Sequence, residues 1–324
     1  MSPREASLHI KACAIEVGFD LCGITSSDII PEARDRYIEW IQKGYNGGMQ
    51  WLSDVQRRTN PRAVIPEAKS VIMLALNYFS RKEPEPEDGV IARYARGRDY
   101  HKVIASMQKH LILLLRKEFP EATFRSYVDY GPFMERPYAE KAGLGFIGKN
   151  GMLITEEFGS YVFLAEVLTS LELEHDAPAI RRCGTCDRCQ TACPTGAFIA
   201  DGMLDSTKCI AYYTIESKED EIPEVVKKAM KGRTFGCDIC QEVCPYNNRL
   251  RNKETTVPDF SPRYTSLDPE DPALRSDAAF LEKFAGTPLM RSKRKGLRRN
   301  LGLPKEDLQE GGTMVLLFRI NLKS

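Results

Sequence analysis

The spacing of apolar residues along the chain predicts at least three helices. Apolar side chains recur every three or four positions over residues 7–17, 33–43 and 100–119, which is the period of a helix with one buried face. Each of these segments is followed directly by a glycine or a proline, residues that commonly end a helix. The third segment is the longest and carries a dense run of leucines.

Other apolar runs are short and predict strands. Residues 71–78 form a short, strongly apolar run that favours a buried strand, and residues 124–128 are predicted to form another strand. Residues 152–155 and 161–169 flank the sequence Glu-Glu-Phe-Gly, a pattern typical of a hairpin. Because helices and strands intermix without a βαβ repeat, we expect an α+β fold with a mixed α/β N-terminal region.

Eight of the ten cysteines lie in one stretch whose spacing indicates iron–sulfur chemistry. A run of four is followed by proline, and a later run of three is also followed by proline; the eighth cysteine lies between them. This is the ligand string of a bacterial ferredoxin, in which the last cysteine of each run binds the other cluster. We therefore assign two [4Fe–4S] clusters, one held by Cys183, Cys186, Cys189 and Cys244, and the other by Cys193, Cys209, Cys237 and Cys240.

Zinc and disulfides are the competing interpretations of these cysteines. Structural zinc favours paired C-x2-C motifs and does not account for a run of four followed by proline. Disulfides require an oxidising compartment, whereas the N-terminal residues lack an apolar signal core and no run of ~20 apolar residues occurs. We expect a cytoplasmic protein with no membrane segment.

The length of 324 residues predicts units beyond the cysteine stretch. We expect three: residues 1–175, a ferredoxin-like unit at residues 176–250, and a helical, basic C-terminal region at residues 251–324. The net charge of +1 gives no global field for a nucleic-acid partner, so such a partner must be recognised by local charge. A cluster of six cations provides it, and the alternative is a solvated helix face: Arg291, Lys293, Arg294, Lys295, Arg298 and Arg299.

Asp129 is a candidate general acid, a residue that would donate a proton during catalysis. It follows the predicted strand at residues 124–128 and precedes a Tyr-Gly-Pro turn, where a loop residue is held on a rigid scaffold. Burial there would raise the pKa of its carboxyl and keep it protonated for donation. The alternative is that Asp129 only stabilises the turn.

The chain resembles the epoxyqueuosine reductase family over residues 7–300. The residues that carry the resemblance are Val128-Asp129-Tyr130-Gly131-Pro132, Glu135-Arg136, the segment from Ala142 to Asn150 (AGLGFIGKN), Arg58-Thr59-Asn60-Pro61, the segment from Tyr94 to His101, the cysteine pattern, and Arg298-Arg299-Asn300. Many relatives continue into helical repeats after this point, whereas residues 301–324 are interrupted by Pro304, Gly311 and Gly312 and end as a short strand or a disordered tail.

The resemblance implies reduction of the epoxide of epoxyqueuosine, at the tRNA wobble position, to queuosine. It implies cobalamin bound by residues 1–175 and reduced through the two clusters by an external low-potential donor, with Asp129 as the proton donor. The implied cobalamin contacts are Arg58, Tyr100, His101 and the backbone around Asn150, Leu153, Ile154 and Thr155. Arg and backbone N–H groups suit the amide arms and phosphate of a corrinoid.

Two other functions remain open at this point. A corrinoid-dependent reductive dehalogenase would pair similar cofactors but would leave the basic cluster without a role. A non-catalytic electron carrier would leave the N-terminal motifs unexplained. The sequence leaves the oligomeric state open, with a monomer as the working expectation.

Overall fold

A four-stranded antiparallel sheet forms the centre of the N-terminal region. The computed structural model describes residues 1–81, 86–247 and 253–304. The strand order is β1-β2-β7-β4, with bounds β1 Leu21–Ser26, β2 Ser70–Asn77, β4 Phe124–Tyr127 and β7 Val162–Thr169. The two long strands, β2 and β7, pair in full register from Ser70 opposite Thr169 to Asn77 opposite Val162.

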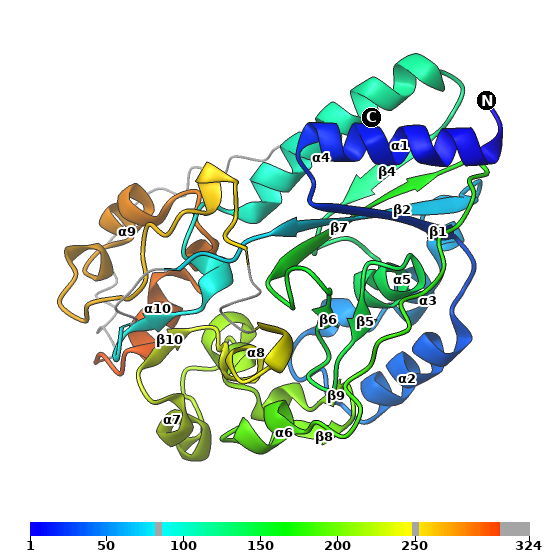
Figure 1. Ribbon diagram of the computed structural model, residues 1–324. Helices are drawn as coiled ribbons and strands as arrows, with labels where there is room; N and C mark the ends of the chain where they lie inside the picture. The colour runs from blue at the N-terminus through cyan, green and yellow to red at the C-terminus, as the bar shows by residue number, and fades with distance from the viewer. Residues whose placement is uncertain (82–85, 248–252, 305–324) are drawn as a thin grey trace.

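Both faces of this sheet are covered, which explains why β2 is buried at every position and apolar from Val71 to Leu76. Ile72, Leu74 and Leu76 pack against α1 (Pro3–Val17) and α4 (Tyr100–Glu118), whereas Met73 and Ala75 pack on the opposite face in the core that includes α5 (Glu135–Lys141). Figure 1 shows α1 and α4 on one side of the sheet and α5 on the other. Side chains alternate between faces along a strand, so a strand buried on both sides needs a continuous apolar run.

The hairpin expected from residues 152–155 and 161–169 is not formed. β6 (Leu153–Ile154) pairs with β5 (Phe146–Ile147), and β7 pairs with β2 and β4. Only an isolated bridge between Thr155 and Gly159 links the two segments. Long-range pairing of β7 with β2 buries far more apolar surface than a local hairpin would.

The cysteine stretch folds into short helices and loops. Its elements are α6 Arg188–Ala192, β8 Phe198–Ala200, β9 Met203–Leu204, α7 Glu224–Met230, β10 Arg233–Phe235 and α8 Ile239–Glu242. β10 pairs in parallel with β3 (Val90–Ile91). A segment inside the predicted N-terminal unit therefore packs on the cysteine stretch, and the boundary at residue 175 does not divide all contacts.

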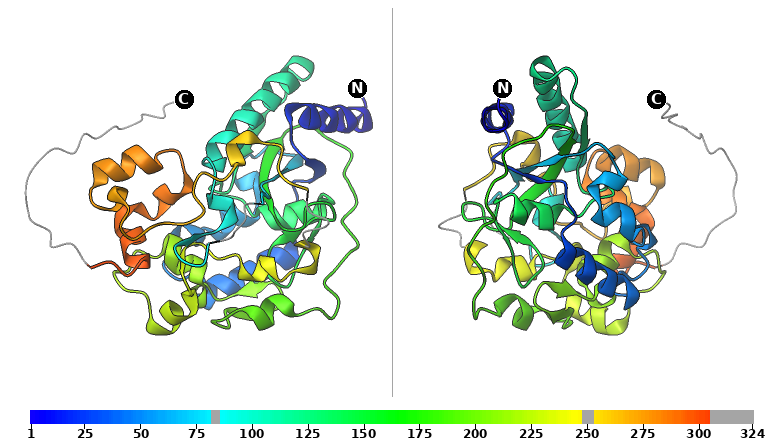
Figure 2. Two further views of the ribbon diagram at one scale, coloured as in Figure 1. Left: turned by 60° about the vertical axis from the view of Figure 1, so that its left-hand side comes forward. Right: turned by 90° about the vertical axis from the view of Figure 1, so that its right-hand side faces the viewer.

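The C-terminal region adds two helices, α9 (Asp277–Phe284) and α10 (Lys293–Asn300). Phe280, Phe284 and Leu297 pack with Ile91 and Phe235 in one apolar core. Figure 2 shows these helices on the side of the molecule away from α1. The predicted tail beyond residue 304 lies outside the described residues.

Two further helices, α2 (Pro31–Gln42) and α3 (Val55–Thr59), follow β1. Short 3-10 turns connect several of the other elements. In the part of the chain that the structure describes, no helix combines the length and the apolar character needed to cross a membrane.

Candidate active site and cluster-binding region

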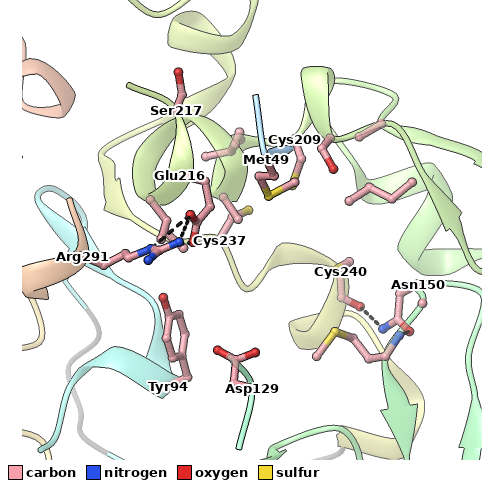
Figure 3. Close-up of a pocket in the computed structure, with 18 of the residues that line it drawn as sticks. Met49, Tyr94, Asp129, Asn150, Cys209, Glu216, Ser217, Cys237, Cys240 and Arg291 are labelled. Atoms are coloured by element: carbon pink, nitrogen blue, oxygen red, sulfur yellow. Dashed lines mark hydrogen bonds and ion pairs between the residues drawn. The ribbon is translucent and has the colours of Figure 1, made fainter. Parts of the chain in front are cut away.

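One large cavity connects the sheet, the cysteine stretch and the C-terminal region. Its volume is about 2910 Å³, and its walls include Asp129 with Tyr100 and His101, and also Cys209, Cys237 and Cys240. Figure 3 shows Asp129 and these three cysteines on walls of the same cavity. The candidate acid and three of the candidate cluster ligands therefore line the same cavity.

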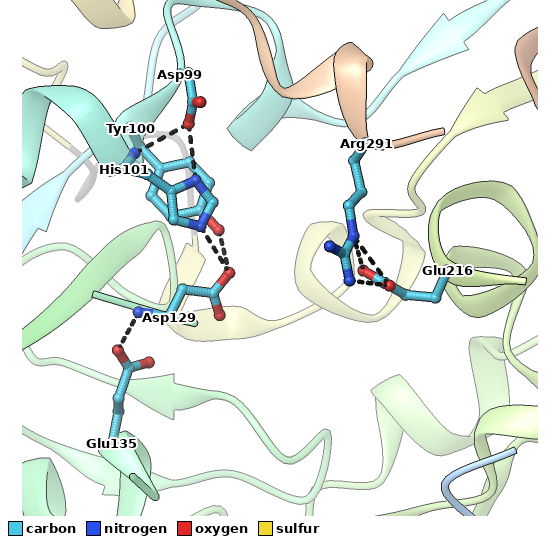
Figure 4. A network of polar contacts seen from close by, with 7 residues as sticks. All are labelled: Asp99, Tyr100, His101, Asp129, Glu135, Glu216 and Arg291. Atoms are coloured by element: carbon cyan, nitrogen blue, oxygen red, sulfur yellow. Dashed lines mark hydrogen bonds and ion pairs between the residues drawn. The ribbon is translucent and has the colours of Figure 1, made fainter. Parts of the chain in front are cut away.

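Asp129 is held by three groups. Its carboxylate accepts a short hydrogen bond from the Tyr100 hydroxyl and lies 3.3 Å from His101 Nε2, and its backbone N–H donates to Glu135 Oε1 at 2.7 Å (Figure 4). Its backbone is left-handed, with φ of 56°, a conformation that residues other than glycine adopt uncommonly. The sequence placed Asp129 at a strand end, and the structure adds the partners that hold it there.

The protonation of Asp129 differs from the expectation. Burial raises the pKa of Asp129, but the hydrogen bonds from His101 and Tyr100 outweigh it, so the pKa lies below its usual range. Burial lowers the pKa of His101, yet hydrogen bonds to Asp129 and Asp99 raise it to about 9. The proton at neutral pH therefore resides on the His101 imidazole, which opposes the predicted neutral Asp129.

His101 is fixed at both ring nitrogens. Its Nδ1 lies 2.7 Å from Asp99 Oδ1, and Asp99 also caps α4 by accepting from the His101 backbone N–H at 3.1 Å. Tyr100 stacks on Phe163 with ring centroids 4.2 Å apart. The sequence identified Tyr100 and His101 as cofactor contacts but missed Asp99, whose only local signal was its position before a helix.

Several of the eight cysteines predicted as ligands lie close enough to raise one another's pKa within the two predicted groups, and the assignment of each ligand stays a prediction. The charge of Cys183 raises the pKa of Cys189 and of Cys244, and the charge of Cys186 raises the pKa of Cys244. In the second group Cys193 acts on Cys209, and Cys209 acts on Cys237 and Cys240. One contact crosses between the groups, from Cys189 to Cys240. Within the described residues, no three His, Cys, Asp or Glu side chains close around a single metal ion.

These thiols need a metal to ionise. Burial raises the pKa of Cys237 to about 12, with a further contribution from Cys209, and burial also raises the pKa of Cys240 well above its usual range. Coordination to iron removes the thiol proton and releases it to solvent. Cluster assembly therefore offsets the free-energy cost of forming a thiolate in a buried position. The set of eight buried or half-buried thiols fits two four-iron clusters.

Comparisons with known proteins agree with this arrangement. A family model described as "Epoxyqueuosine reductase QueG, DUF1730" matches residues 58–130, and a model described as "4Fe-4S double cluster binding domain" matches residues 182–247. The epoxyqueuosine reductase of Synechocystis sp. is 43% identical, with 83% of this chain and 94% of that protein covered. This chain belongs to the epoxyqueuosine reductase family.

Other members extend the similarity. The epoxyqueuosine reductase of Escherichia coli is 37% identical over 89% of this chain and 77% of its own length. A crystal structure of an epoxyqueuosine reductase with an epoxyqueuosine-modified tRNA-Tyr stem loop has a TM-score of 0.84 at 32% identity, covering 92% of this chain and 80% of that one. A Bacillus subtilis epoxyqueuosine reductase, described with its catalytic aspartate loop swung out of the active site, has a TM-score of 0.81 at 32% identity, with the same coverage.

The cobalamin contacts expected from the epoxyqueuosine reductase resemblance divide into two sets. Arg58 and Asn150 line the cavity together with Tyr100 and His101. Leu153, Ile154 and Thr155 do not line it; all three are buried, and Thr155 donates both its backbone N–H and its hydroxyl to Gly159 O. Leu153 and Ile154 pair in the small β5–β6 sheet and Thr155 forms an isolated bridge with Gly159, so a cofactor contact from these three stays a prediction.

Arg58 fits a polar ligand in the cavity. Its Nε is buried, and no described acceptor reaches it. A buried guanidinium donor without an acceptor is costly, and a phosphate or amide oxygen of a bound cofactor would supply one. Asn150 is already engaged in part, with Nδ2 3.5 Å from Cys240 O and Oδ1 accepting from Met152 N.

Most side chains of the basic cluster in this chain are engaged in contacts within the protein. Arg291 pairs with Glu216, Arg294 with Asp277 and Lys295 with Asp220. Arg298 donates to Leu274 O and Pro304 O.

Arg299 reaches the backbone carbonyls of Tyr213, Ser217 and Glu219. For Lys293, no hydrogen bond or ion pair occurs within the described residues. The structure thus gives most of these side chains a scaffolding contact that the sequence did not reveal.

Proposed function

We propose that this protein reduces the epoxide of epoxyqueuosine in tRNA to the alkene of queuosine. The observation that carries the proposal is that Asp129 and His101 line the same cavity as Cys209, Cys237 and Cys240. It is supported by relatives of similar length that are named for this activity, and by the relative whose structure contains an epoxyqueuosine-modified stem loop.

The overall reaction requires two electrons and two protons. Loss of the epoxide oxygen breaks two C–O bonds, forms the C=C bond and releases water. Each [4Fe–4S] cluster passes one electron at a time, so an external low-potential donor must refill the pair for every turnover. Cobalamin bound in the cavity would supply low-potential reducing chemistry at its cobalt.

Arg58 is the residue best suited to hold a polar edge of that cofactor, because its buried Nε lacks an acceptor among the described residues. Asn150 lines the same volume. We infer that both contact the cofactor and that the predicted contacts Tyr100 and His101 act mainly on Asp129.

The protons reach the substrate through Asp129. His101 carries a proton at neutral pH because Asp99 and Asp129 stabilise the imidazolium. As negative charge develops on the leaving oxygen, the Asp129 carboxylate accepts the His101 Nε2 proton and passes it to that oxygen, and solvent supplies the second proton of the released water. Tyr100 keeps the carboxylate oriented toward the cavity. General acids of this kind typically contribute 10²–10⁴-fold to a rate.

The tRNA would approach from the rim that carries the basic cluster. Arg291 lines the cavity, and its guanidinium lies 5.1 Å from the centre of the exposed Trp51 ring. An exposed aromatic beside a cation suits a splayed nucleotide. Lys293 and Lys295 also line the cavity and are candidates for phosphate contacts. In the B. subtilis relative the loop with the catalytic aspartate has been seen swung out, and we infer that the loop carrying Asp129 also moves.

The test is turnover by anaerobically reconstituted protein. Wild type loaded with iron, sulfide and cobalamin should convert epoxyqueuosine in tRNA, and Asp129→Asn should lose ~10²–10⁴-fold in rate while keeping its iron and cobalamin content. Wild type that binds both cofactors yet leaves epoxyqueuosine-tRNA unchanged would reject the proposed reaction. Near-normal turnover by Asp129→Asn would reject the assigned role of the residue.

A further inference from the structure

Glu166 is a buried carboxyl in the middle of the central sheet. It lies on β7 with no exposed surface, and no described donor reaches either of its carboxyl oxygens. Its neighbours on the same face of the strand, Val162 and Leu168, pack in the core that includes α5. The group that meets Glu166 there is the carboxyl of Glu135, the first residue of α5.

Two carboxyl groups in contact, of which one has no exposed surface and the other is half-buried, do not both ionise. Transfer of an unpaired carboxylate out of water costs far more than protonating it, so at least one of the pair holds a proton. Burial raises the pKa of Glu166 well above its usual range, and the charge of Glu135 raises it further. Glu166 is therefore the protonated partner, and Glu135 accepts its O–H.

The other side of Glu135 holds the backbone of Asp129. Glu135 Oε1 accepts the Asp129 N–H at 2.7 Å, at the residue whose left-handed φ of 56° is unfavourable without support. A side chain on the following Gly131 is excluded, because an added Cβ would lie 2.6 Å from Tyr127 Cβ. The turn therefore depends on a few contacts: Tyr100 and His101 on the Asp129 side chain, and Glu135 on its backbone.

We propose that Glu135 and Glu166 share one proton. Because Glu166 holds this proton, Glu135 stays an anionic acceptor for the Asp129 backbone N–H. This hydrogen bond, called the latch below, keeps the Asp129 carboxylate facing the cavity. Glu135 and Glu166 are positioning residues in this account, since neither donates to the substrate. The inference rests on the proposed function for the role of Asp129, but the latch itself is a property of the protein without substrate.

The latch weakens on acidification. Burial raises the pKa of Glu135 to about 7, with a further rise from the charge of Asp129. As pH falls through this value Glu135 becomes neutral and a poorer acceptor, so the turn is held above about pH 7 and loosened below it. The other titratable groups acting on the pair are Arg136, which favours the anion of Glu135, and Tyr127, whose cross-strand position opposes Glu166.

The experiment measures amide hydrogen exchange of residues 124–134 between pH 6 and 9, corrected for intrinsic exchange, on reconstituted protein without tRNA. Glu135→Gln replaces the anion by a weaker acceptor and should lower protection at pH 8 by about 10-fold, with a similar fall in kcat and little change in KM. The loss of protection that the wild type shows as pH falls below about 7 should also be absent in Glu135→Gln.

Glu166→Gln keeps a neutral donor toward Glu135. It should therefore retain protection within about 2-fold and leave the loss of protection on acidification near pH 7, because the amide, like the protonated Glu166 carboxyl, donates to the anion without adding charge. Glu140→Gln is the matched control on α5: Glu140 accepts the backbone N–H of Ile147 at 2.9 Å, so its loss should leave residues 124–134 unchanged.

Wild-type protection in Glu135→Gln, or a loss in Glu166→Gln equal to that in Glu135→Gln, would overturn the proposal. If Glu135→Gln fails to fold, judged by circular dichroism and iron content, the pH dependence of Glu166→Gln decides: loss of protection displaced well below pH 7 would mean that Glu166 is ionised in the wild type and rejects the shared proton. Absence of wild-type turnover on tRNA would reject the proposed function alone, because the exchange measurement needs no substrate.

Discussion

Replacement of Asp99 by asparagine should lower the upper pH limit of turnover. His101 lies between two carboxylates, with Nδ1 2.7 Å from Asp99 and Nε2 3.3 Å from Asp129. Asparagine retains the cap of α4, because its side-chain oxygen can still accept from the His101 backbone N–H, but it removes one of the two charges. The substitution therefore separates electrostatics from helix capping.

The size of the effect follows from the two partners. Together they raise the pKa of His101 from 6.5 to about 9 against the opposing effect of burial. A single nearby opposite charge typically changes a pKa by roughly 1 to 3 units, so loss of Asp99 should bring the pKa of His101 to roughly 7–8. Turnover requires the protonated imidazole, so it is present below the pKa of His101 and lost as pH rises through it.

The assay is single-turnover conversion of epoxyqueuosine-tRNA from pH 6 to 10 with pre-reduced protein. Wild type should lose activity near pH 9, and Asp99→Asn roughly one to two pH units lower, with nearly equal rates at pH 6. Asp271→Asn is a control, since Asp271 caps a short helix in the C-terminal region by accepting from Ala273 N. An alkaline limit that stays near pH 9 in Asp99→Asn would show that His101 is not the source of the proton.

Three further predictions concern the clusters and the basic region. Cys209→Ala should lower iron content from about eight toward four and leave one cluster spectrum intact; full iron content would refute the ligand assignment. Arg299→Ala should destabilise the protein by about 3 kcal/mol, seen as a lower Tm, because Arg299 donates to three backbone carbonyls, whereas Lys295→Ala, which breaks an exposed pair, should change stability by less than about 0.5 kcal/mol. Lys293→Ala with Lys295→Ala should flatten the salt dependence of log tRNA affinity by about 1.5 to 2; an unchanged slope would place the tRNA contact elsewhere.

The double-cluster unit and the position of Asp129 could be predicted because their signals are local. A four-iron cluster needs thiolates on short loops, so the spacing from Cys183 to Cys193 already encodes much of the site. Asp129 lies where an apolar strand meets a turn, and the structure ends β4 at Tyr127, two residues before it. The predicted helix at residues 100–119 corresponds to α4, Tyr100–Glu118, because its periodicity extends over five turns.

Features that depend on distant partners could not be predicted in this way. β7 pairs with β2, ninety residues away, and nothing near residues 161–169 distinguishes that pairing from a hairpin. The guanidinium of Arg299 is satisfied by carbonyls about eighty residues upstream, so a dense run of cations was interpreted as a phosphate site. The lone Glu166 in an apolar strand was a visible signal for the buried pair, and the sequence analysis did not use it.

The direction of the Asp129 pKa shows why a site must be treated as a network. Alone in a cavity, a carboxyl of this kind would be neutral, as the sequence argument assumed. In the structure each ionised carboxylate is next to a group that carries a proton: Asp129 and Asp99 adjoin His101, and Glu135 adjoins Glu166. Negative charge added to the cavity by reduction would raise the pKa of His101 further, so we expect its proton to stay in place until a leaving oxygen takes it through Asp129.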